Sequence, residues 1–192
     1  MTQLGNGLSA ANHHEDALAV MEADLSTEQR LGISEARLLV LKSNLASIYD
    51  ALGRDQDALL ITRDVYSGSM KLHGEEHFDT LTEAHNYATS LGNLKRVKDA
   101  RSILRKMMPV ARRILGDCHE LTLKMRWNYA NAVREDDCAT RDELREANDT
   151  LEDTARIARR VLGPSHPNVV GENSIHRSLE LVQAKLALLD GY

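Results

Sequence analysis

The sequence predicts an all-α solenoid, an array of antiparallel helix pairs, and a recurring turn is the first reason. A glycine followed three residues later by a histidine occurs at 74–77, again 42 residues on at 116–119, and again 47 residues further at 163–166. Gly32 lies 42 residues before Gly74 but has no histidine after it. A fixed period of this size is the signature of a repeat array.

The second reason is a composition that favours helix over strand. Leu and Ala are abundant, β-branched residues are not clustered, and 11 Gly and three Pro leave little room for long loops. With 42% hydrophobic and 28% charged residues, the 192-residue chain can build an ordinary folded core. One helix pair cannot bury its apolar stripe alone, so stacked neighbours must bury it together.

Helical spacing of apolar residues defines the first elements. Residues 4–11 resemble the tail of a helix that its glycines weaken. Asn12 and Ser34 are candidate caps for two helices that end at Gly32 and Gly53. Their inward positions are Ala17, Val20, Met21 and Leu25, and then Leu38, Leu41, Leu45, Ile48 and Leu52.

The same pattern continues to the end of the chain. Asp79 or Thr80 begins one helix, and Pro167 suits the first turn of a last helix that runs to about residue 189. The helices expected here span about 55–72, 79–91, 95–115, 120–133, 140–162 and 168–189. Inward positions are Ala58, Ile61, Val65, Leu72, Leu81, Ala84, Ala88, Leu91, Ala100, Leu104, Met107, Ile114, Leu121, Met125, Tyr129 and Val133.

Three regions follow from these spacings. Residues 1–11 are a partial or frayed first helix, 12–166 the repeat array, and 167–192 a C-terminal capping helix. Within the array the pairs are about 12–32 (a half repeat), 33–74, 75–116 and 117–163, the last carrying five extra residues.

Finer motifs recur inside the pairs. Asn44, Asn86 and Asn128 are 42 residues apart, and each is followed two residues later by Ala. Small packing residues stand at Ala17, Ala58 and Ala100, and the turn at 162–167 is Leu-Gly-Pro-Ser-His-Pro. Over roughly residues 10–170 the chain resembles tetratricopeptide repeats, specifically the 42-residue variety of kinesin light chain. It departs from that subunit because the heptad coiled coil that joins it to the motor chain is absent.

The resemblance implies a right-handed superhelix in which the first helix of each pair lines a concave groove. An asparagine ladder there could hold an extended peptide, because an amide both donates and accepts hydrogen bonds. The alternative is that these amides bond only within the stack. Trp127 could anchor a ligand or be partly buried packing. The candidate groove residues are Asn44, Asn86, Asn128, Ser47, Thr82, Thr89, Lys124, Asn131, His85 and Trp127.

The turn histidines His77, His119 and His166 do not predict a metal site. Successive repeats hold them roughly 10 Å apart, the spacing of packed helices, so they cannot converge on one ion. Hydrogen bonding in the turn or at the helix entry is the better interpretation. We therefore expect neither a metal nor another cofactor.

Charge and motifs exclude several function classes. The net charge of −5 gives no reason to expect nucleic acid, although the basic run over 95–115 could meet acidic protein or nucleic acid if it is not simply a solvated face. No apolar run is long enough for a membrane span, and no secretory signal is visible. Cys118 and Cys138 have no pairing motif, so we expect reduced thiols and a cytoplasmic protein.

No catalytic motif is present, so we do not expect an enzyme. The sequence predicts a non-catalytic adaptor or scaffold whose concave groove binds an extended protein or peptide segment. The alternative is a structural or self-associating repeat fragment without a groove ligand, because the open end of an array exposes apolar surface.

Overall fold

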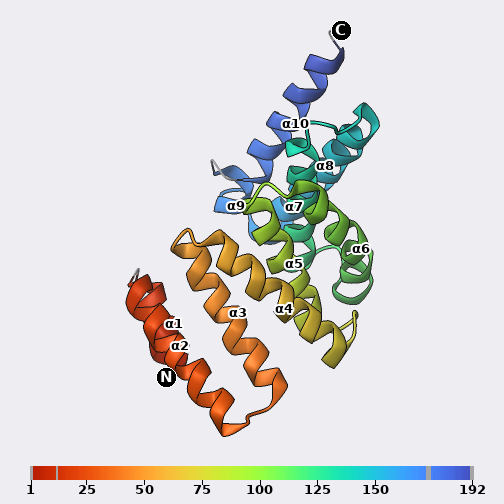
Figure 1. Ribbon diagram of the computed structural model, residues 1–192. Helices are drawn as coiled ribbons and strands as arrows, with labels where there is room; N and C mark the ends of the chain where they lie inside the picture. Colours follow the sequence, from red (N-terminus) through yellow and green to blue (C-terminus); the bar gives the residue numbers. More distant parts are fainter. Residues whose placement is uncertain (1, 12, 172–173, 191–192) are drawn as a thin grey trace. The chain divides into compact units, whose positions relative to one another are not determined.

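The computed structural model describes residues 2–11, 13–171 and 174–190, and all of its regular structure is helical (Figure 1). The chain divides into two compact units, residues 1–94 and 95–192. The first unit contains α1 (Thr2–Ala10), α2 (His14–Leu31), α3 (Glu35–Ala51), α4 (Asp55–His73) and α5 (Phe78–Asn93). The second contains α6 (Val97–Leu115), α7 (Glu120–Glu135), α8 (Arg141–Leu162), α9 (Pro167–Val170) and α10 (Ile175–Asp190).

In the first unit each helix packs on the next one along the chain, from α1 to α5 (Figure 1). Of the predicted stripe of α3, Leu41, Leu45 and Ile48 are at most 4% exposed, whereas Leu38 and Leu52 are half-buried. The packing alanines Ala17 and Ala58 are fully buried in the same core. Helix packing of this kind buries the apolar stripe of each helix against its neighbours.

Residues 2–10 form helix α1 although their glycines have a low helix propensity, and the packing of Gly5 explains why. A Cβ atom at Gly5 would lie 2.6 Å from Sδ of Met21, a buried side chain of α2. Only glycine lets α1 approach α2 this closely, and the contact compensates for the weak helix propensity of the segment. The expected cap Asn12 lies outside the described residues.

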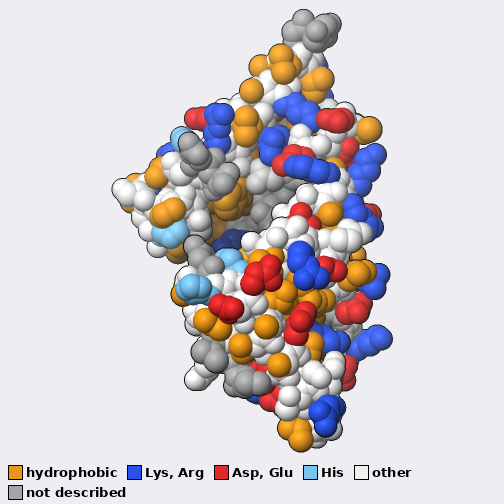
Figure 2. Space-filling view, turned by 60° about the vertical axis from the view of Figure 1, so that its left-hand side comes forward, with side chains coloured by type: hydrophobic (Ala, Val, Ile, Leu, Met, Phe, Trp, Pro, Cys, Tyr) orange, Lys and Arg blue, Asp and Glu red, His pale blue; other side chains and the backbone are white. Residues whose placement is uncertain are grey.

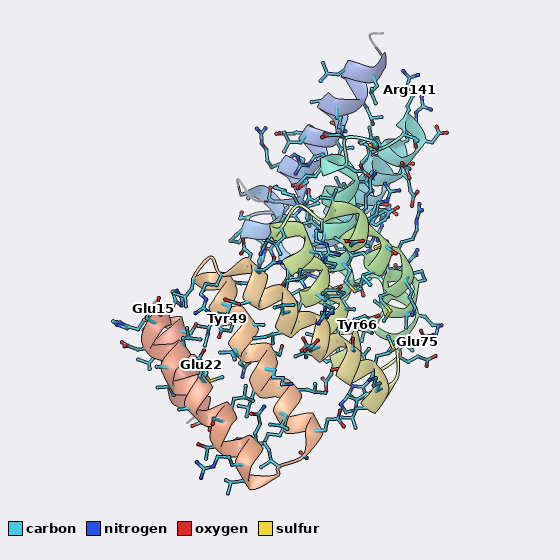
Figure 3. The ribbon with its side chains drawn as sticks, viewed as in Figure 1. Glu15, Glu22, Tyr49, Tyr66, Glu75 and Arg141 are labelled. Atoms are coloured by element: carbon cyan, nitrogen blue, oxygen red, sulfur yellow. The ribbon has the colours of Figure 1, made fainter. Side chains whose placement is uncertain are left out.

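A polar contact also joins α2 to α3 in the first unit. The Tyr49 hydroxyl donates to Oε1 of Glu22 at 2.7 Å, and the guanidinium carbon of Arg54 lies 4.5 Å from the centre of the tyrosine ring (Figure 3). Burial, together with the hydrogen bond to Glu22, raises the pKa of Tyr49 to about 12. The phenol therefore remains a donor at neutral pH.

The second unit is completed by its last helix. Helix α6 packs on α7, α7 on α8, and α10 lies against both α7 and α8. Lys185 of α10 donates to the backbone carbonyls of Arg134 and Asp136 at 2.7 and 2.9 Å, where α7 ends. The Asp136 carbonyl also accepts from the backbone N–H of Ala139 at 3.1 Å, so Lys185 adds a second donor there and ties α10 to the end of α7.

The single last helix expected from Pro167 to about residue 189 is wrong. Pro167 does stand in the first turn, but α9 ends at Val170 and α10 begins at Ile175. Ser174 starts α10 anew, because its hydroxyl accepts from the backbone N–H of Arg177 at 3.2 Å.

The recurring histidines begin helices, as the sequence analysis expected. Nδ1 of His77, His119 and His166 accepts from the backbone N–H two residues on, at 3.2 Å in each case. Helix α5 therefore begins at Phe78, one or two residues before the predicted start at Asp79 or Thr80. The glycines of the same turns, Gly74, Gly116 and Gly163, have φ between 83° and 95°.

Two residues predicted to point inward do not. Leu72 and Ile114 are each 41% exposed, and Val161 at the same position of the next turn is 47% exposed. All three lie two residues before the turn glycine, at the end of a helix, where neighbours cover a side chain only in part.

The turns after α3 and α5 have different residues at the same left-handed backbone position, and a substitution can test the effect. Gly53 has φ 68°, whereas Lys95, 42 residues later, takes φ 58° with a side chain. We expect Lys95→Gly to raise the free energy of unfolding by about 1 kcal/mol, because left-handed backbone strains every residue with a Cβ. Urea denaturation measures the difference.

Lys95→Ala is the matched control, since it removes the exposed ion pair of Lys95 with Glu135 but keeps the strain. A Lys95→Gly protein no more stable than Lys95→Ala would contradict the expectation.

Candidate functional site

Six of the ten predicted groove residues line two adjoining hollows of the first unit, which we call the α3–α5 hollow. The larger part has a volume of about 520 Å³ and is lined by Asn44 and Thr82. The smaller part, of about 100 Å³, is lined by Ser47, His85, Asn86 and Thr89, and Ser43 lines both. The resemblance thus selected residues that the fold brings to one face.

A buried acid lies at the junction of the two parts, and the sequence analysis missed it. Glu83 is 8% exposed, with Oε1 accepting from the Ser43 hydroxyl at 2.8 Å and Oε2 from the Asn86 amide at 3.2 Å. Burial raises the pKa of Glu83, and the hydrogen bonds from Ser43 and Asn86 oppose that rise. Glu83 occupies the position that Leu41 and Met125 hold 42 residues before and after it. An acid at an otherwise apolar core position was the signal available in the sequence.

Three hydroxyl groups of the hollow donate to carbonyls of their own helices. Ser47 donates to the carbonyl of Ser43, Thr82 to that of Phe78 and Thr89 to that of His85, at 3.0–3.3 Å. Each oxygen still has lone pairs, so these side chains can accept from an incoming N–H group.

The edge of the larger hollow is apolar. Val40 and Phe78 line it and are 56% and 48% exposed. The hollow therefore combines apolar contacts at its edge with a carboxylate inside. A peptide could place an apolar side chain on the edge and a donor toward Glu83.

The other four predicted residues lie on α7 in the second unit, where the last helix covers part of that helix. Nε1 of Trp127 donates to the Ser178 hydroxyl of α10 at 2.7 Å, so the indole is used within the chain. Lys124 is ion-paired with Glu120 at 2.8 Å. The pocket beside Lys124 and Trp127 has a volume of only about 10 Å³, enough for about one water.

The two amides on α7 are those of Asn128 and Asn131, and both side chains are half-buried. Asn128 has interaction partners within the chain, whereas Oδ1 of Asn131 is buried without a hydrogen-bond partner among the described residues. The pocket beside Lys124 and Trp127 is much smaller than the larger part of the α3–α5 hollow.

The basic run of α6 faces acidic neighbours, which supports its interpretation as a solvated face. Arg101 is ion-paired with Asp136 and Glu143. Over the molecular face shown in Figure 2, Lys and Arg side chains generally stand near Asp and Glu side chains. Further pairs are Lys95–Glu135, Arg105–Glu146 and Arg112–Asp117. Four cations of the run are therefore paired with acids, which lowers the positive charge that it presents to solvent.

Comparison with known proteins agrees with the resemblance. A tetratricopeptide repeat model matches residues 139–168, which cover α8 and the turn after it. Two crystal structures of the nearly identical TPR-like repeats of a Podosopora anserina kinesin light chain match with TM-scores of 0.75 and 0.73 at 20% identity. They cover 100% and 98% of this chain and 95% and 94% of those chains.

This chain is similar to kinesin light chain-like tetratricopeptide repeat proteins. The structure of BtubC (BKLC) from P. vanneervenii also matches, with a TM-score of 0.64 and 15% identity over 98% of this chain and 79% of that one. The predicted all-α solenoid is thereby confirmed as a fold.

Sequence similarity also extends to much larger proteins. The clustered mitochondria protein homolog of Ajellomyces capsulatus is 25% identical over 66% of this chain, and that of Aspergillus fumigatus is 24% identical over 77%. The chain spans about a tenth of the length of these relatives, 10% and 11% respectively. Among the described helices, none combines the length and hydropathy that crossing a bilayer requires.

The buried Glu83 predicts a pH dependence of stability. Because its pKa is raised in the folded protein, the folded state holds this proton more tightly than the unfolded chain does. The contribution of Glu83 to the free energy of unfolding should therefore fall as pH rises from the ordinary Glu range through the raised pKa.

The side chain of Glu83→Gln cannot titrate. The variant should therefore lack the part of the decline in the free energy of unfolding that Glu83 causes. Urea denaturation of both proteins between about pH 4 and about pH 8 measures it, since this window brackets an ordinary Glu and a raised one. The same dependence on pH in both proteins would contradict the assignment.

Proposed function

We propose that the α3–α5 hollow binds an extended segment of another protein, which makes the chain a non-catalytic adaptor module. The observation that carries the proposal is the buried Glu83 beside Asn86 in a hollow whose edge is apolar. A repeat fold that serves as a protein-interaction scaffold supports it.

The chemistry of the hollow suggests what the segment carries. An apolar side chain of the ligand can pack on Val40 or Phe78, because contact there removes exposed hydrophobic surface from water. Glu83 has accepted two hydrogen bonds, and a carboxylate offers about four lone-pair sites. A backbone N–H, Lys or Arg of the ligand can use one that remains.

The amides on the same face suit a peptide backbone. Asn44 lines the larger part and Asn86 the smaller, so both can meet an extended strand of ligand. The location proposed for this binding is the cytoplasm, because Cys118 and Cys138 are free and exposed.

A peptide-display library tests the proposal, and the binding constants of the enriched peptides give its magnitude. Phe78→Ala is expected to weaken binding about tenfold, since buried aromatic contacts are the usual energetic anchors. Leu60→Ala is the matched control, because Leu60 is also 48% exposed but lies on α4 and does not line the hollow.

A folded Asn44→Ala, Asn86→Ala variant is expected to bind more weakly than the wild type, and adding Asn128→Ala tests the second unit separately. If no peptide is enriched, or if the double variant binds as tightly as the wild type, the hollow is not the binding site. Light scattering that shows concentration-dependent association in place of peptide binding would favour the self-associating alternative.

A further inference from the structure

We propose that His73, His77 and Asp79 form a binding site for a divalent transition-metal ion at the turn between α4 and α5. Ligand atoms of the three side chains all lie within 4.8 Å of one another. The two imidazole rings are stacked with centroids 4.4 Å apart, and Nδ1 of His77 is 3.7 Å from a carboxylate oxygen of Asp79. Among the residues that the structure describes, no other group of three or more His, Cys, Asp or Glu side chains brings its ligand atoms this close together.

The donor set fits zinc and its neighbours in the first transition series. Two imidazoles and one carboxylate are ordinary ligands for Zn²⁺, Co²⁺ and Ni²⁺. Ligand atoms around a tetrahedral Zn²⁺ lie roughly 3.3 Å apart for bonds of ~2.0 Å, so the three must close by ~1.5 Å at most. His77 and Asp79 are exposed, and their side chains have room to rotate. Three protein ligands leave one coordination position open.

Comparison of the three repeat turns separates this site from helix capping. All three turns carry the capping histidine, but the residues that match His73 are Leu115 and Leu162, and those that match Asp79 are Leu121 and Asn168. The other turns therefore lack the three-ligand set and keep only the cap. The site lies within one turn and does not require His77, His119 and His166 to converge.

Metal binding at His77 competes with capping. A neutral imidazole has one lone pair, and in the metal-free protein Nδ1 of His77 accepts from the backbone N–H of Asp79 with it. A metal ion at Nδ1 takes the lone pair that accepts this hydrogen bond. A metal ion at Nε2 requires the tautomer whose proton is on Nδ1, and that nitrogen then cannot accept. In both cases the cap must be released. Binding should therefore perturb the start of α5, which gives a readout independent of affinity.

The surroundings are favourable for a cation. Glu75, labelled in Figure 3, and Glu76 lie in the same turn and add negative charge. His73 and Asp79 also line the larger part of the α3–α5 hollow, so a bound ion would stand at its edge. The metal site is nonetheless independent of the proposed peptide binding and is tested without a peptide.

The test is titration of the protein with Zn²⁺ by calorimetry and with Co²⁺ by absorption spectroscopy, using a Cys118→Ser, Cys138→Ser background to remove thiol ligands. We expect one ion per chain. The double variant His73→Leu, Asp79→Leu has leucine at both positions, as the next turn does at Leu115 and Leu121. It should bind the metal ion at least about tenfold more weakly. His119→Ala, which removes an equivalent cap, should leave binding unchanged.

Nuclear magnetic resonance supplies a second measurement if the double variant folds poorly. Zn²⁺ should shift the imidazole signals of His73 and His77 and the backbone amide of Asp79 in the unmutated turn. The proposal is overturned if binding is not saturable, if the double variant binds as tightly as its parent, or if the shifts appear at His13 and His14 instead.

Discussion

Every long helix of this chain has an apolar stripe that it cannot bury alone, and burial of that stripe by the adjacent helices is the constraint on which the structure depends. Small residues make the contact close enough. Ala17 and Ala58 are fully buried, and Gly5 lets α1 approach Met21. Because the stabilisation is between neighbours, the outer surfaces are left free to vary, which suits a scaffold.

The turns meet a second requirement, which is to end one helix and begin the next within a few residues. Glycine with positive φ leaves the first helix, and a histidine side chain satisfies a backbone N–H of the next. Since this chemistry repeats, departures from it stand out. Glu83 at an apolar core position and His73 with Asp79 beside a capping histidine are departures of this kind, and both lie in the first unit.

Much of the fold was predictable because it is periodic. The repeat spacing gave the long helices to within a few residues, and Ala84, Leu91 and Met125 were correctly placed in the core. The start of α5 was predicted one or two residues late because the usual cap preference for Ser, Thr, Asp and Asn favoured Asp79 or Thr80, although His77 was expected near the helix entry. The division between α9 and α10 was missed because the sequence analysis gave weight to Pro167 and not to the restart at Ser174.

The candidate site was predictable only in outline. The asparagine period identified the face that holds Asn44 and Asn86, because side chains on one helix face recur with the repeat. The bond between Ser43 and Glu83 joins residues 40 positions apart, and no local pattern in the sequence encodes such a pair. Whether a groove residue is covered also depends on tertiary packing, as Trp127 under α10 shows.

The position of Trp127 has a practical consequence. It is the single tryptophan of the chain, and its indole N–H is bonded to a hydroxyl of the last helix. Its fluorescence emission therefore depends on whether α10 is docked on α7, while the first unit contributes no tryptophan signal. The tryptophan fluorescence of the unlabelled protein thus reports on the packing of α10 against α7.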